Sequence, residues 1–111
     1  MITIEGLKDF GADVNTGLSR CLNKEDFYLK MVNMGLADKR FEELEGVLKE
    51  KNLDSAFEMC HALKGVIGNL SLTPMYDKIC EMTELLRARQ DVDYLPMYEE
   101  IKASREKLLA L

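Results

Sequence analysis

The residues best suited to chemistry surround the only histidine of the chain, His61. Lys64, Gly65 and Gly68 follow it after three, four and seven positions. In an α-helix these spacings place all four residues on one strip of the surface, which we call the His61 strip. A glycine inside a helix costs about 1 kcal/mol relative to alanine, so two of them need a reason beyond helix formation. Their lack of side chains lets another molecule come close to the imidazole.

An imidazole beside an ammonium group is suited to reaction with an anion. Near its usual pKa of about 6.5, a neutral imidazole is a competent nucleophile. Phosphoryl transfer requires mainly in-line positioning and compensation of charge. We therefore predict that His61 accepts a phosphoryl group and that Lys64 compensates its charge. Gly65 and Gly68 would form the surface at which a partner docks.

Plainer interpretations of the same residues stay open. A single histidine on a helix is often only a solvated or partly buried structural residue. The two glycines could instead allow close packing between helices, and Gly65 could end the helix. In either case the His61 strip would have no reactive role.

The segment that carries the His61 strip has the most regular helical pattern in the chain. Its apolar residues recur in alternating steps of three and four, which predicts a helix with one side in the core. They are Leu53, Ala56, Cys60, Leu63, Ile67 and Leu70. His61 follows Cys60 by one residue, or about 100° around the helix. Its ring should therefore lie at the edge of the packed face, near solvent.

Two helices are predicted before this segment. Apolar spacing favours one long helix over about 24–51, with a possible bend near Gly35 and Asp38, although two helices would also fit. A short N-terminal helix is expected to begin at a cap, either Asp13 or Asn15.

Two more helices are predicted after it. Thr73 is expected to cap the first, with Pro74 in its first turn and an end near Arg89. The second should cover about 94–110, because Pro96 is tolerated in a first turn.

Composition agrees with a small helical domain. The 111 residues include 2 Pro, 7 Gly and no Trp, too few turn formers for an all-β sandwich. Four long amphipathic helices can bury their apolar sides only against one another. The predicted fold is therefore all-α, an antiparallel up-and-down four-helix bundle with a short extra N-terminal helix. We expect one domain over 1–111, with its core at about 12–110.

Charge argues against nucleic acids and membranes as partners. The 15 basic and 20 acidic residues give a net charge of −5, which repels phosphate backbones and anionic lipids. No apolar stretch approaches the roughly 18 residues of a membrane span, and the first residues lack a signal-peptide pattern. Cys21, Cys60 and Cys80 form no disulfide or metal-binding pattern. We expect a cytoplasmic protein with reduced thiols and no bound metal.

The residues around His61 resemble the histidine-containing phosphotransfer (HPt) domains of two-component phosphorelays. The run His61-Ala62-Leu63-Lys64-Gly65 matches the HxLKG core of that family, and Gly68-Asn69-Leu70 matches the residues that often follow it. Looser similarity extends over about 12–90 and includes Gly17-Leu18-Ser19-Arg20 and Phe27-Tyr28.

The resemblance implies a phosphoryl carrier. His61 would receive the group from an aspartyl phosphate of a response-regulator receiver domain and pass it to another receiver. Lys64 would be the charge partner and Gly65 the point of approach. A hybrid sensor histidine kinase is a further implied partner. No cofactor is implied for this chain, because any Mg²⁺ would be held by the receiver.

One position departs from the family. Many members place Gln or Glu 22 residues after the histidine, where it hydrogen-bonds the other ring nitrogen. This chain has Thr83 there. Thr83 could make a shorter hydrogen bond, Glu84 lies beside it, and Arg87 could bond the phosphoryl group. We expect these three residues to support the site.

Other function classes are less consistent with the sequence. No GxxxxGK[ST] or GxGxxG motif is present to bind a nucleotide, so a phosphoryl carrier is favoured over an ATP-using kinase. Cys60 and His61 point about 100° apart and cannot form a hydrolytic pair. A haem bundle would need a methionine opposite His61. The main alternative is a docking module of the same fold that binds receiver or kinase domains without carrying phosphate.

Overall fold

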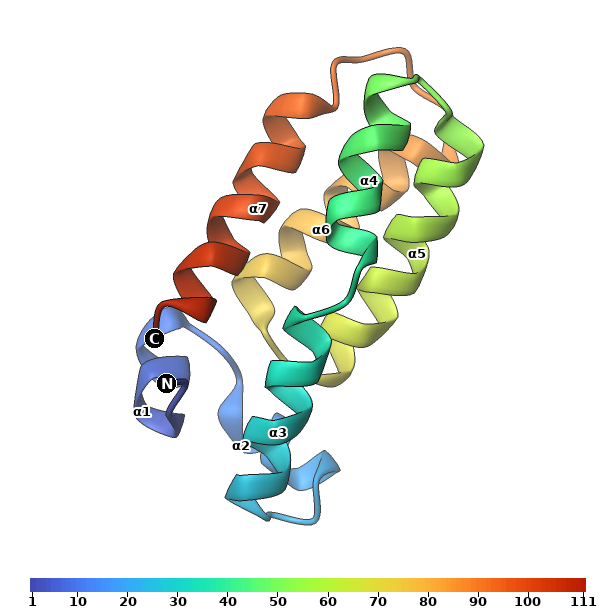
Figure 1. Ribbon diagram of the computed structural model, residues 1–111. Helices are drawn as coiled ribbons and strands as arrows, with labels where there is room; N and C mark the ends of the chain where they lie inside the picture. Colours follow the sequence, from blue (N-terminus) through green and yellow to red (C-terminus); the bar gives the residue numbers. More distant parts are fainter.

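The chain folds entirely into helices. The computed structural model describes all 111 residues and contains seven α-helices and no strand (Figure 1). The helices are α1 (Ile4–Phe10), α2 (Val14–Arg20), α3 (Glu25–Leu36), α4 (Arg40–Lys49), α5 (Leu53–Asn69), α6 (Thr73–Arg87) and α7 (Leu95–Leu109). This confirms the predicted all-α class. No helix combines the length and apolar character needed to cross a lipid bilayer.

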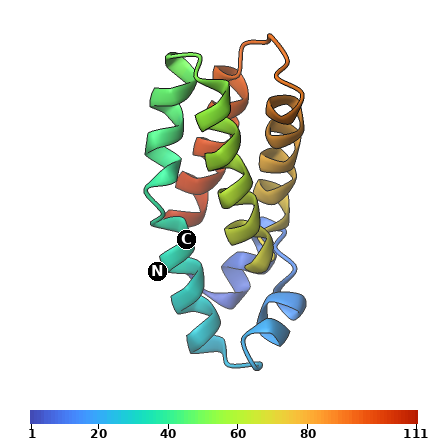
Figure 2. The same ribbon diagram turned by 90° about the vertical axis from the view of Figure 1, so that its right-hand side faces the viewer.

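Helices α4 to α7 lie side by side along the long axis of the molecule (Figures 1 and 2). The molecule measures 42 × 23 × 20 Å along its principal axes. Helix α5 packs against α4 and α6, and α7 also contacts both α4 and α6. Helices α1, α2 and α3 gather at one end (Figure 1). The buried apolar side chains form one cluster of 24 residues, which includes Ile2 and Leu7. The packed core therefore begins before residue 12.

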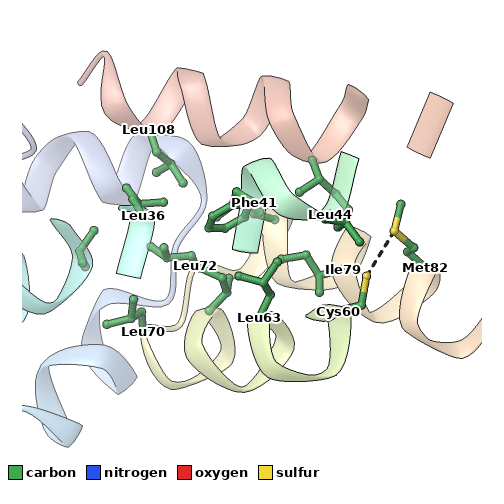
Figure 3. Packing of buried hydrophobic residues seen from close by; sticks show 14 of the residues in the cluster. Leu36, Phe41, Leu44, Cys60, Leu63, Leu70, Leu72, Ile79, Met82 and Leu108 are labelled. Carbon is green, nitrogen blue, oxygen red and sulfur yellow. Dashed lines mark hydrogen bonds between the residues drawn. The ribbon is translucent and has the colours of Figure 1, made fainter. Parts of the chain in front are cut away.

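Helix α5 follows its predicted apolar pattern. The Asn52 side chain accepts a hydrogen bond from the Ser55 backbone N–H (3.2 Å) and so caps the helix. Four residues on one side are fully buried, and we call them the core seam: Ala56, Cys60, Leu63 and Ile67. Figure 3 shows Leu63 and Cys60 pointing into the interior, toward Ile79 and Met82 of α6. The seam fixes the rotation of α5 and thus the direction of the His61 strip.

The segment 24–51 forms two helices, so the interpretation as one long helix is wrong and its alternative holds. Helix α3 ends at Leu36, and α4 begins at Arg40. Two contacts explain the break. The Asp38 carboxylate accepts a hydrogen bond from the Arg40 backbone N–H (2.9 Å), and Arg105 of α7 donates to the carbonyl of Leu36 (2.7 Å). Side chains thus satisfy backbone groups that a continuous helix would have paired.

Two helix starts also differ from expectation. Helix α1 was not predicted; Thr3 caps it by accepting a hydrogen bond from Gly6 N–H (3.0 Å), and Gly11 ends it with a φ of 104°. Thr73 is the first residue of α6 and not its cap.

The other predicted starts are confirmed. Asp13 caps α2 through the Thr16 N–H (3.2 Å). Pro74 and Pro96 both lie in first turns.

Candidate functional site

His61 lies on the exposed side of α5. Its imidazole makes no hydrogen bond and has the ring of Phe57, one turn earlier, as its aromatic neighbour. The two ring centroids are 5.7 Å apart, and the ring planes are inclined by 25°. The offset of about 100° from Cys60 predicted this exposure. The imidazole is therefore reachable from solvent.

The His61 strip borders an open cleft of about 410 Å³, which we call the His61 cleft. Its lining residues come from α2, α5 and α6: Arg20, His61, Lys64, Gly65, Gly68, Asn69 and Tyr76. Two of them carry positive charge and none is acidic, although the whole chain has a net charge of −5. Neither Lys64 nor Arg20 forms an ion pair. The cleft is a local cationic surface beside a free imidazole.

The two glycines of the His61 strip have different surroundings. A Cβ atom built on Gly65 meets no atom within 4 Å. A Cβ atom on Gly68 would lie 2.8 Å from Cε1 of Tyr76, whose ring covers this point from α6. Gly65 is therefore open to solvent, whereas Gly68 is a site of close packing between helices. Gly68 still lines the cleft through its backbone.

The structure gives different positions to the three expected supporting residues. Thr83 is fully buried, and its hydroxyl donates to the carbonyl of Ile79 on its own helix (2.7 Å). The expected hydrogen bond from Thr83 to His61 is therefore absent. Glu84 is exposed and forms an ion pair with Arg87 (3.4 Å). The guanidinium carbon of Arg87 lies 5.0 Å from the centre of the Phe57 ring, which itself stacks with His61.

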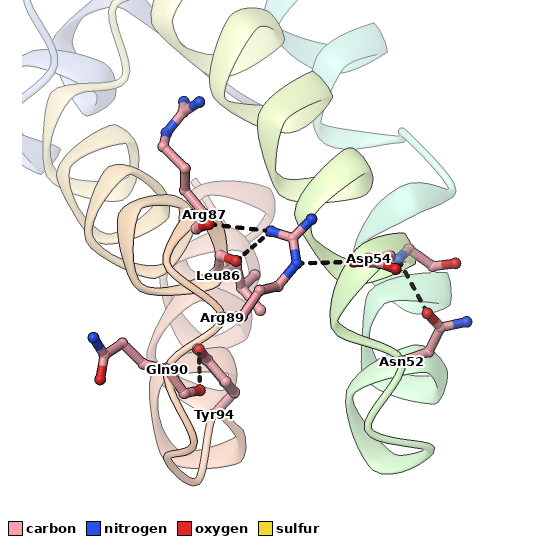
Figure 4. Close-up of polar contacts among 8 residues, drawn as sticks. Asn52, Asp54, Leu86, Arg87, Arg89, Gln90 and Tyr94 are labelled. Atoms are coloured by element: carbon pink, nitrogen blue, oxygen red, sulfur yellow. Dashed lines mark hydrogen bonds and ion pairs between the residues drawn. The ribbon is translucent and has the colours of Figure 1, made fainter.

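Two arginines lie over the Phe57 ring: Arg87, the last residue of α6, and Arg89, just beyond the helix. Besides Arg87, the guanidinium of Arg89 lies 5.1 Å from the ring centre. Arg89 donates to Asp54 of α5 (2.8 Å) and to the carbonyl of Leu86, as Figure 4 shows. Guanidinium groups over an aromatic face are attracted to it. His61 thus stacks on an aromatic ring that two arginines cover, and its imidazole makes no hydrogen bond.

Arg20 and Tyr76 belong to the cleft, and neither was expected there. Arg20 is the last residue of α2, and its Nη1 donates to the carbonyl of Gly68 at 2.8 Å. No local pattern connects a residue 41 positions before His61 with the strip. The only signal was its place in the Gly17–Arg20 run of the HPt resemblance.

Tyr28 of α3 holds α2 in the position that brings Arg20 to the cleft. A Cβ atom on Gly17 of α2 would lie 2.5 Å from the Tyr28 ring, so only glycine allows this contact. The Tyr28 hydroxyl donates to the carbonyl of Leu70 at the end of α5 (2.8 Å). Burial raises the pKa of Tyr28 to about 12, so the hydroxyl keeps its proton. One side chain thereby joins α2, α3 and α5.

The Cys60 thiol is not exposed beside His61. Its thiol lies in the core, 3.4 Å from the sulfur of Met82, and burial raises its pKa to about 12. A thiolate nucleophile beside His61 is therefore disfavoured. No group of three or more His, Cys, Asp or Glu side chains is arranged to hold a metal ion.

No protein-family model, curated protein or solved structure matches this chain. The function is therefore inferred from the His61 cleft and from the residues of the motif.

Proposed function

We propose that this protein is a histidine phosphotransfer protein of the HPt type. His61 accepts a phosphoryl group from an aspartyl phosphate of a receiver domain and passes it to another receiver. The observation that carries the proposal is the exposed imidazole in an open cleft that contains Lys64 and no carboxylate. Gly65, with open space above it, lets the receiver approach the ring.

In the proposed step, the unprotonated nitrogen of the imidazole attacks the phosphorus of the aspartyl phosphate. An N–P bond forms, and the P–O bond to the aspartyl carboxyl oxygen breaks. The electron pair of that bond leaves on the carboxylate, and the proton on the other ring nitrogen passes to solvent. Lys64 offsets the negative charge of the phosphoryl oxygens. The reverse sequence delivers the group to the next receiver.

The proposal includes the finer architecture, location and partners. We take the fold as an antiparallel up-and-down four-helix bundle in which α3 and α4 together form one bent member. The contacts of α5 with α4 and α6, and of α7 with the same two helices, support this arrangement. The partners are receiver domains and a hybrid sensor kinase in the cytoplasm, and the chain itself needs no cofactor.

Incubation with a phosphorylated receiver domain tests the function. The wild type should gain an acid-labile phosphoryl adduct, and His61→Gln should gain none. Because His61 is exposed, the variant should keep the wild-type circular dichroism spectrum. Equal labelling of both proteins would overturn the role of His61. Binding of the receiver without any adduct on the wild type would favour the docking module instead.

A further inference from the structure

Arg20 differs from every other arginine of the chain in its charge environment. The chain has five arginines, and four of them form an ion pair with a carboxylate: Arg40 with Asp38, Arg87 with Glu84, Arg89 with Asp54 and Arg105 with Glu42. Arg20 forms no ion pair. Asp13 attracts it electrostatically but is not within ion-pair distance, and the Asp13 carboxylate accepts hydrogen bonds from the Thr16 hydroxyl and N–H (2.7 and 3.2 Å). The unpaired arginine is the one that lines the His61 cleft.

The guanidinium of Arg20 is also anchored. A guanidinium has five N–H donors, and this one uses a single donor, Nη1, on the carbonyl of Gly68 (2.8 Å). The anchor holds a flexible side chain in place, which lowers the entropy lost when its remaining donors bind a ligand. Those donors form a planar fork of the kind that binds phosphate oxygens in pairs.

An anion bound at the Gly68 end of the cleft requires a compensating positive charge. Gly68 and Asn69 lie in the last turn of α5, where the helix dipole places partial negative charge. Helix α5 has no basic residue in that turn. An anion bound there would be repelled unless a positive group from elsewhere compensated the exposed carbonyls. Arg20, from α2, supplies that group.

We propose that Arg20 is a second phosphoryl-binding residue, which acts with Lys64 on the group that His61 accepts. The inference rests on the proposed function. During transfer the phosphoryl oxygens lie between the Lys64 ammonium and the free donors of Arg20. The N–P bond forms and the acyl P–O bond breaks as described above. Arg20 stays protonated throughout the transfer.

The chain offers a matched control for Arg20. Arg105 also donates to a carbonyl at the end of a helix, that of Leu36 (2.7 Å), but it lies outside the His61 cleft. Arg20→Gln and Arg105→Gln both remove a helix-end contact, and Arg105→Gln also removes the ion pair with Glu42. A loss caused only by weaker packing would therefore be at least as large in Arg105→Gln.

The test uses the full chain and phosphoramidate, a small donor that does not require docking of a receiver. Arg20→Gln should be phosphorylated on His61 about 10- to 100-fold more slowly than wild type, the cost of losing a hydrogen bond to a charged group. Arg105→Gln should stay within about twofold of the wild-type rate. In ³¹P NMR titrations, the phosphoryl pKa should rise in Arg20→Gln, because a nearby cation favours the dianion. A change in packing alone would not move it.

The outcomes separate the two proposals. If the wild type is labelled and Arg20→Gln matches it in rate and phosphoryl pKa, the role of Arg20 is overturned and the function of His61 stands. If neither phosphoramidate nor a phosphorylated receiver labels the wild type, the proposed function fails, and the role of Arg20 fails with it. If Arg20→Gln does not fold, Arg20→Lys decides. Arg20→Lys keeps the positive charge but loses the planar set of donors. If Arg20→Lys is phosphorylated more slowly than Arg105→Lys, the role of Arg20 is supported; if the two rates are equal, the role is overturned.

Discussion

Helix α5 has two sides that follow different physical rules. The core seam is fully buried and packs against neighbouring helices. The His61 strip is open instead. Gly65 has free space above it, and His61, one turn earlier, is exposed. Side chains of the core seam must fill the space between helices, whereas the His61 strip leaves space for another molecule to reach the imidazole. Changes to the seam should therefore alter stability, and changes to the strip should alter chemistry.

Gly68 shows where the two sides meet. It belongs to the His61 strip by its spacing, yet Tyr76 covers it and Arg20 bonds its carbonyl. A residue on the strip is thus not automatically a residue of the proposed docking surface. Contacts from α2 and α6 decide which glycine remains free.

The largest effect on stability is expected in the seam. Leu63→Ala should lower the free energy of unfolding by about 2–5 kcal/mol, because it leaves a cavity between α5 and its neighbours. Urea unfolding measures this, with the exposed Glu58→Ala as a control that should change stability by less than about 0.5 kcal/mol. Where it remains folded, Leu63→Ala should still be phosphorylated. A Leu63 variant as stable as the control would contradict the assignment of the seam.

After the loss of labelling expected for His61→Gln, the largest effect on chemistry is expected at Gly65. Gly65→Leu should slow transfer from a phosphorylated receiver about 100-fold, because the side chain displaces the incoming group. It should also stabilise the helix by up to about 1 kcal/mol.

Gly46 of α4 is a matched control, since a Cβ atom there also meets nothing within 4 Å. Gly46→Leu should bring a similar gain in stability without loss of transfer. Equal transfer rates in the two leucine variants would remove Gly65 from the docking surface.

A smaller effect is expected from the ring beneath the histidine. Phe57→Leu should reduce the phosphorylation rate about 2- to 10-fold, because an aromatic pair contributes about 0.5–1.5 kcal/mol beyond its buried area. Phe57→Tyr keeps the ring and should restore the rate. Stopped-flow or quench-flow measurement of both variants tests this. Identical rates for the leucine and tyrosine variants would show that stacking does not orient His61.

The smallest effect concerns the cap of the helix that carries Arg20. Hydrogen bonds from Thr16 lower the pKa of Asp13 below its usual 3.8. The folded state thus favours the carboxylate, and the cap stabilises the protein fully above that pH. Its contribution falls as the pH drops from 3.8 through the lower folded-state value.

Unfolding experiments across this pH range compare wild type with Asp13→Ala. The stability difference between the two proteins should shrink as the pH falls. A difference that is constant with pH would contradict the role of the carboxylate.

Features that depend on neighbours along the chain were predictable. The pattern of α5 and the exposure of His61 follow from the spacing of apolar residues along the chain, because each residue of a helix is rotated by a fixed angle from the one before it. The Asp13 cap and the first-turn prolines also act within a few residues. The interruption between α3 and α4 was harder to predict from the sequence, because it depends partly on a hydrogen bond from Arg105, near the far end of the chain.

The sequence alone therefore determined the all-helical class and the strip on which an imidazole, an ammonium group and two glycines lie, since helix periodicity is local. Only the tertiary structure decided that Thr83 turns into the core, that Tyr76 covers Gly68 and that Arg20 reaches the cleft. These outcomes depend on how helices distant in sequence pack together. Side-chain volume and hydrogen bonding across the interfaces set that packing, and no short-range pattern encodes it.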